Sequence, residues 1–140
     1  MKRTMSTLGT ADDTNLGLAP DLPKRIEKPW GHEIWFAHTE RYAGKIIHVT
    51  AGHRLSLQYH DRKDETSHLI SGRMRLWQGT DRDRLTETII EAGATWRNTP
   101  GTVHTVEAIE DAAFFEVSTP ELDDVVRLED QYGRQGTSAP

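Results

Sequence analysis

The sequence predicts a single all-β domain built as an antiparallel sandwich or barrel. Short runs rich in β-branched and aromatic residues alternate with turn signals along the 140 residues, and many of these turns contain one of the 11 glycines. No segment before Pro120 keeps a helical period. About eight to ten closely spaced strands of this kind are typical of sandwiches and barrels.

The expected strands follow one another in short steps from Glu33 to Ser118. Turns are expected at Ala51-Gly52, at Ser71-Gly72, over Thr80–Asp83 and over Glu91–Gly93. The runs themselves are EIWFAH (33–38), KIIHVT (45–50), RLSLQYH (54–60), SHLI (67–70), RMRLW (73–77), LTETII (85–90), ATWRN (94–98), VHTVEAI (103–109) and AAFFEVS (112–118).

The two ends of the chain lack this pattern. Residues 1–21 are rich in Thr, Asp, Gly and Pro, so we expect a mobile arm, with the barrel domain over residues 22–134. The charged stretch Pro120–Arg134 predicts a turn of helix or an ordered strap across the barrel, and residues 135–140 are expected to fray.

Composition excludes several classes of function. The chain has no cysteine, so disulfides, thiolate metal sites and cysteine nucleophiles are absent. A net charge of −5 gives no long-range attraction for nucleic acid or an anionic membrane. The start of the chain lacks the apolar centre of a signal peptide, so we expect a cytoplasmic protein that acts on a small molecule.

One strand carries a row of polar side chains. If residues 54–60 are extended, Arg54, Ser56, Gln58 and His60 share one face, and leucines and a tyrosine share the other. A polar row that points into a barrel has to bind something, because unpaired polar groups are costly to bury.

Two spaced motifs contain this row. The first is Gly52-x5-Gln58-x-His60-x4-Glu65-x6-Gly72, and the second is Gly93-x5-Thr99-Pro100-Gly101-x2-His104. The pair resembles the two motifs of the cupin superfamily, a family of small jelly-roll barrels (double-stranded β-helices). Gln58, Thr99 and Ala108 depart from it, since the family usually has His, Pro and Asn there.

The resemblance implies that Gln58, His60, Glu65 and His104 converge as ligands of one divalent metal ion. Two imidazoles, a carboxylate and an amide oxygen suit Zn, Mn, Fe, Co or Ni, with open positions left for water or substrate. The alternative is a barrel that has lost its metal and only binds a ligand.

Three further stretches narrow the resemblance: KPWG (28–31), LSLQYH (55–60) and DDVVRLEDQYGR (123–134). Together they resemble the type II mannose-6-phosphate isomerase domain, which interconverts mannose 6-phosphate and fructose 6-phosphate with a divalent metal. The resemblance makes Lys45 and Glu116 candidates for proton transfer, with Lys45 also a candidate contact for sugar or phosphate. The candidate substrate contacts are His48, Arg54, Arg127 and Arg134.

Two departures affect the substrate. Lys63 and Thr105 stand where the family usually has arginine, so the site for phosphate is weakened, and a neutral sugar or a sugar acid is an alternative substrate. An iron-dependent oxygenase, a lyase on a small polar metabolite and a non-catalytic binding protein are alternative functions. The EIWFAH run with Trp30, Trp35 and Tyr59 also predicts a homodimer formed between sheets.

Overall fold

A computed structural model describes residues 17–137, and within that range it contains strands but no helix. The structure therefore confirms the all-β prediction, and no described helix is available to span a membrane. Most of the expected mobile arm, residues 1–16, lies outside the described residues. The described strands are β1 (Lys24–Lys28), β2 (Gly31–His38), β3 (Ala43–Val49), β4 (Leu57–Tyr59), β5 (Glu65–Ser71), β6 (Arg73–Gly79), β7 (Leu85–Glu91), β8 (Thr95–Asn98), β9 (Val103–Ala108), β10 (Ala112–Ser118), β11 (Val126–Glu129) and β12 (Gly136–Thr137).

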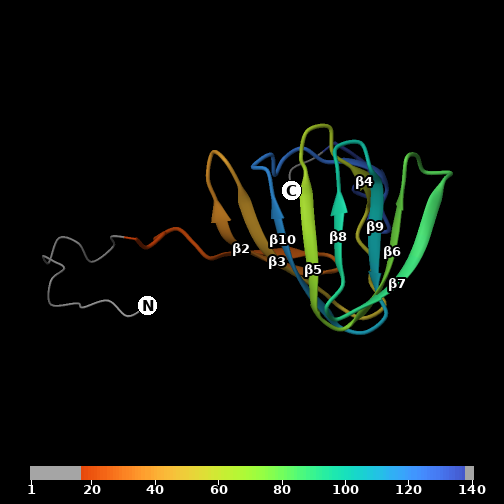
Figure 1. The fold of residues 1–140 in the computed structure, drawn as a ribbon, viewed down its shortest axis with the longest axis horizontal. Coiled ribbons are helices and arrows are strands. Elements are labelled where there is room, and N and C mark those ends of the chain that lie inside the picture. The colour runs from red at the N-terminus through yellow and green to blue at the C-terminus, as the bar shows by residue number, and fades with distance from the viewer. Residues whose placement is uncertain (1–16, 138–140) are drawn as a thin grey trace, which may run out of the picture.

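The strands form two six-stranded antiparallel sheets that face each other (Figure 1). The first sheet has the order β1-β2-β3-β10-β5-β8, and the second has the order β12-β11-β4-β9-β6-β7. Strands far apart in sequence become neighbours, so that β3 and β5 both pair with β10. This crossing of the chain brings β4, β5 and β9, which carry the two motifs, around one interior.

All nine expected runs contain a strand, but one is much shorter than predicted. Only Leu57–Tyr59 of the run 54–60 is a strand, because the preceding residues pair with β9 through separated contacts. Arg54, for example, makes one isolated bridge to Glu107. The polar alternation in the sequence continues into a segment that is not a regular strand.

The C-terminal tail joins the second sheet rather than forming a helix. In β11, Val126 and Arg127 pair with Tyr59 and Gln58 of β4, so the strap is partly a strand. Within the segment 135–140 that was expected to fray, Gly136 and Thr137 pair with β11, and residues 138–140 lie outside the described residues. An antiparallel partner satisfies backbone groups that solvent would otherwise bind.

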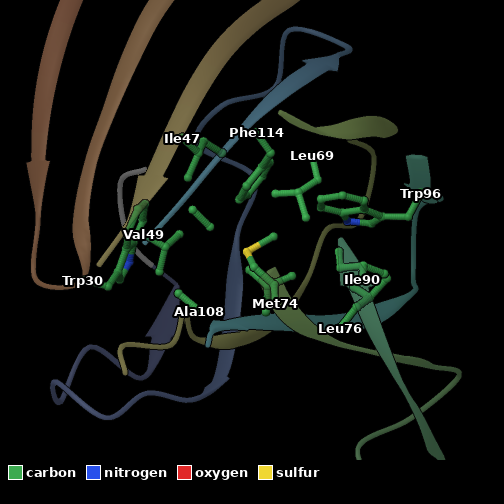
Figure 2. Close-up of a cluster of buried hydrophobic side chains, with 12 residues drawn as sticks. Trp30, Ile47, Val49, Leu69, Met74, Leu76, Ile90, Trp96, Ala108 and Phe114 are labelled. Atoms are coloured by element: carbon green, nitrogen blue, oxygen red, sulfur yellow. The ribbon is translucent and has the colours of Figure 1, made fainter. Parts of the chain in front are cut away.

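The apolar core fills one part of the space between the sheets (Figure 2). It includes Trp30, which is only 3% exposed, so this residue packs within the chain and not on a surface available to a second copy. Gly72 closes the hairpin between β5 and β6 with φ of +89°, and an added Cβ there would lie 2.3 Å from the carbonyl oxygen of Asp111.

Candidate metal centre and substrate cavity

An open cavity lies between the sheets next to the core. It contains about 670 Å³ of empty space, a volume that includes the open solvent at its mouth. Its walls are unusually polar for the interior of a barrel. The charged residues and histidines of the lining are Lys28, Glu33, Lys45, His60, Lys63, Glu65, His104, Glu116, Arg127 and Arg134.

His60, Glu65 and His104 form a compact cluster in this cavity. One ligand atom from each lies within 4.8 Å of the others, and all three residues are buried. His60 Nε2 lies 3.1 Å from Glu65 Oε1, and His104 Nε2 lies 3.5 Å from Glu65 Oε2. The structure therefore brings together the two histidines and the carboxylate of the predicted ligand set.

Both imidazole rings are held with Nε2 directed at Glu65. His60 Nδ1 donates to the carbonyl oxygen of Asp124 at 2.6 Å, and His104 Nδ1 donates to that of Thr102 at 2.9 Å. Such backbone bonds select the tautomer that leaves Nε2 as a metal ligand. Burial lowers the pKa of His104, which favours the neutral ring that a metal requires. The cluster thus fits a divalent ion in both donor chemistry and orientation.

Gln58 lines the same cavity as the His60–Glu65–His104 cluster. It comes from β4 and is paired directly with His104 of β9. Asn98 Nδ2 donates to Glu65 Oε2 at 3.1 Å and fixes the carboxylate from β8. The role of Gln58 as a ligand stays a prediction.

Lys63 is the principal site residue that the sequence analysis did not assign. Its Nζ lies 3.1 Å from Glu65 Oε1 and 3.0 Å from Glu116 Oε2, and all three side chains are buried. Burial lowers the pKa of Lys63, but the two carboxylates raise it by more, so the net shift of the pKa is upward. Lys63 thus retains a positive charge inside the cavity and links the candidate base Glu116 to the metal cluster. Its position two residues before Glu65 in the first motif was the available signal.

A second group of charges surrounds Glu33. Lys45 Nζ lies 3.2 Å from Glu33 Oε1 and 5.2 Å from the centre of the Trp35 ring, whose Nε1 donates to the same carboxylate at 2.8 Å. Burial raises the pKa of Glu33, but the nearby ammonium groups of Lys45 and Lys28 lower it by more. The net shift is downward, so Glu33 is held as a carboxylate. Lys28 and Glu33 were also not assigned from the sequence, because nothing in residues 28–33 indicates that their side chains face the cavity.

Arg127 and Arg134 reach the same cavity from the C-terminal segment. Arg127 is 6% exposed and comes from β11. Arg134 is held by Asp130, with Nε and Nη2 donating to the carboxylate at 2.9 and 3.0 Å. Both predicted arginines therefore line the same cavity as Lys28 and Lys45.

Two predicted substrate contacts lie elsewhere, and their assignment is corrected. His48 is absent from the cavity lining and stacks on His32, with ring centres 4.3 Å apart. Its position follows from the β3 alternation, in which Lys45, Ile47 and Val49 are buried and His48 is turned to the other face. Arg54 lines a separate recess with Leu57, because the chain before β4 departs from regular strand geometry.

Comparisons with known proteins agree with this architecture. A family model described as "Mannose-6-phosphate isomerase C-terminal" matches residues 20–130. The chain is 34% identical to the xanthan biosynthesis protein XanB of Xanthomonas campestris over 115 residues, and this alignment covers 79% of the chain. The chain spans only 24% of that relative's length.

Three solved structures share the fold at low sequence identity. KdgF from a Halomonas species has a TM-score of 0.62 at 17% identity, covering 71% of this chain and 88% of its own. Oxalate decarboxylase from Bacillus subtilis has a TM-score of 0.65 at 21% identity, and the match covers 75% of this chain and 30% of the decarboxylase. The capsular polysaccharide assembling protein CapF from Staphylococcus aureus has a TM-score of 0.63 at 17% identity, and the match covers 76% of this chain and 34% of CapF. These likenesses show the fold, a cupin barrel.

Proposed function

The chain belongs to the mannose-6-phosphate isomerase C-terminal family, and we propose that it is a metal-dependent cupin enzyme that interconverts an aldose and a ketose. The proposed substrates are mannose 6-phosphate and fructose 6-phosphate, which the family description supports. The observation that carries the proposal is the buried His60–Glu65–His104 cluster joined through Lys63 to Glu116. The cluster lies in a polar cavity that opens to solvent, so a small molecule can approach it.

The reaction moves a proton between C1 and C2 of an open-chain sugar, so it needs a base that can carry one proton and a way to stabilise developing negative charge on oxygen. A divalent ion bound by His60, Glu65 and His104 would supply that stabilisation as a Lewis acid. The chain must then supply the base, hold the sugar and keep water out.

Glu116 is the better placed of the two candidate bases. Its Oε2 accepts a hydrogen bond from Lys63 at 3.0 Å, while Lys63 also contacts the metal ligand Glu65. Glu116 is therefore fixed beside the metal cluster on a rigid central strand, β10. Lys45 is directly opposite Glu116 in the strand register, but its ammonium group turns to Glu33 instead. We assign proton transfer to Glu116, and we assign to Lys63 the role of holding that carboxylate in position through their hydrogen bond.

The test is an anaerobic interconversion assay with mannose 6-phosphate and fructose 6-phosphate in added Mn²⁺, Co²⁺ or Zn²⁺. We expect turnover in the parent chain and a loss of about 10²-fold or more in Glu116→Gln, since a positioned base contributes about 10²–10⁴-fold. Glu107→Gln, which changes a partly exposed carboxylate outside the cavity, is the matched control and should keep full activity. Absence of turnover with every metal, or oxygen consumption with ferrous iron, would contradict the isomerase assignment.

A further inference from the structure

Gln78 and Asn98 form a chain of side-chain hydrogen bonds that ends at the carboxylate of Glu65. Gln78 Nε2 donates to Asn98 Oδ1 at 2.7 Å, and Asn98 Nδ2 donates to Glu65 Oε2 at 3.1 Å. We propose that this chain, the amide relay, positions Glu65 for the metal ion, so that Gln78 controls metal affinity from outside the cavity lining. The inference rests on the metal centre of the proposed function but not on the reaction assigned to that centre.

Two donors hold Glu65, one on each carboxylate oxygen. Lys63 Nζ lies 3.1 Å from Oε1, and Asn98 Nδ2 lies 3.1 Å from Oε2. The last torsion of a glutamate side chain has only a broad preference, so a single contact leaves the carboxylate free to rotate. With both contacts in place, Oε1 lies against His60 and Oε2 against His104. Asn98 therefore fixes the oxygen that Lys63 does not reach.

The direction of the amide relay follows from the chemistry of its groups. A carboxylate only accepts hydrogen bonds, so Asn98 must turn its NH2 group to Glu65 and its oxygen away from it. Asn98 is only 1% exposed, and a buried carbonyl oxygen needs a donor. Gln78 supplies that donor, while its amide nitrogen also donates to the carbonyl oxygen of Arg97 at 2.9 Å. Gln78 therefore selects the orientation of Asn98 that suits Glu65.

The bond between Gln78 and Asn98 joins the two sheets. Gln78 belongs to β6 of the second sheet, and Asn98 belongs to β8 of the first. Each is paired directly with a proposed ligand on the neighbouring strand, Gln78 with His104 and Asn98 with Glu65. The relay therefore connects the two sheets at the level of the two ligands that a metal ion has to bind together.

Gln78→Glu reverses the outer end of the amide relay. The new carboxylate has no N–H to donate, so it would meet the oxygen of Asn98 with another acceptor. Asn98 would then turn its NH2 group to the new carboxylate and its oxygen to Glu65, and the bond to the ligand would be lost. The added negative charge by itself would instead favour a bound cation. The relay and simple charge attraction therefore predict opposite changes in metal affinity.

The test is calorimetry with Mn²⁺ on the metal-stripped full chain, together with thermal unfolding. We expect Gln78→Glu and Asn98→Leu each to weaken Mn²⁺ binding by on the order of 10- to 100-fold, as is typical for residues that orient metal ligands. Thr86→Glu is the matched control, because it adds the same charge at an exposed residue directly opposite Gln78 in β7. This control should change the Mn²⁺ affinity by less than about threefold, since salt screens an exposed charge.

A double variant separates positioning from a purely structural role. In the relay Gln78 acts on the metal through Asn98, so adding Gln78→Glu to Asn98→Leu should change the Mn²⁺ affinity by less than about twofold more. If Gln78 only joins the sheets, its replacement lowers the unfolding temperature but leaves the Mn²⁺ affinity at the parent's value, and that result overturns the relay. A higher Mn²⁺ affinity in Gln78→Glu also overturns it.

The outcomes separate the relay from the proposed function. Mn²⁺ binding that weakens as expected supports the relay even if no isomerisation is found, and unchanged binding overturns the relay even if isomerisation is found. If Asn98→Leu does not fold, the comparison of Gln78→Glu with Thr86→Glu decides the matter, because Gln78 is only half-buried. A parent chain that binds none of Mn²⁺, Zn²⁺ and Co²⁺ overturns the metal centre and the relay together.

Discussion

Replacing Lys63 with methionine tests the link between the metal cluster and Glu116. Lys63 shares its ammonium group between Glu65 and Glu116, at 3.1 and 3.0 Å, and the three side chains are 4%, 6% and 7% exposed. Methionine keeps most of the volume but removes the charge, so two buried carboxylates lose their common cation. Removing one partner of a buried ion pair costs about 3–5 kcal/mol.

The expected loss depends on metal. In excess chelator, we expect Lys63→Met to lower the free energy of unfolding by about 3–5 kcal/mol. With a saturating divalent ion, the loss should be smaller, because the ion neutralises Glu65 in place of Lys63 and only Glu116 stays uncompensated. The addition of metal should therefore stabilise the variant more than it stabilises the parent.

Urea denaturation with Mn²⁺ or Zn²⁺, and again with chelator, measures both quantities. Lys24→Met is the matched control, since Lys24 is exposed on β1 and should change stability by less than about 0.5 kcal/mol. Lys63→Arg should recover part of the loss because it restores a cation. A Lys63→Met loss that is the same with and without metal would refute the reasoning, and so would no loss in chelator.

Three other predictions concern the metal, the C-terminal segment and assembly. His60→Ala and His104→Ala should each lower the metal content from about one ion per chain towards zero by elemental analysis, while His68→Ala, which changes an exposed histidine, should keep it; equal content in all four proteins would mean that the ligand set is wrong. Burial raises the pKa of the Asp130 carboxyl, but the hydrogen bonds from Arg134 lower this pKa by more, so the stabilising contribution of Asp130 is present above about pH 4 and is lost as the pH falls through the depressed pKa. Asp130→Asn should therefore lower the free energy of unfolding by about 1–2 kcal/mol at pH 7, measured by urea denaturation, and by progressively less below about pH 4. A difference between the variant and the parent that stays constant with pH would exclude this cause. Light scattering should give about twice the 15.9 kDa of one chain if the predicted homodimer forms, and a mass near one chain across the micromolar range would remove it.

The sequence predicted the central strands well because their local signals are strong. β10 coincides with its expected run, and the hairpin at Gly72 has the glycine that its backbone conformation requires. The strands that were missed, β1, β11 and β12, are short or charged and lie towards one edge of each sheet. Such segments become strands through a partner such as β2 or β4, which a local pattern does not reveal.

The candidate site was predicted unevenly for a related reason. The spacing of the two motifs selected His60, Glu65 and His104, which the fold brings within 4.8 Å. Alternation counted across residues 54–60 put Arg54 in the same row, but the regular strand begins only at Leu57. Lys28 could not be assigned, because its proximity to Arg127 arises from two sheets that no local pattern connects.

The C-terminal strap shows why spacing alone does not define such a site. The Asp124 carboxylate accepts backbone N–H bonds from three successive residues, Asp61, Arg62 and Lys63, at 2.6 to 3.0 Å, while its carbonyl oxygen accepts from His60. One strap residue therefore fixes both the imidazole of a proposed ligand and the backbone of the lysine that pairs with Glu65. The ligand motif determines which atoms are available to a metal, but a residue 64 positions away in the sequence helps to determine where they point.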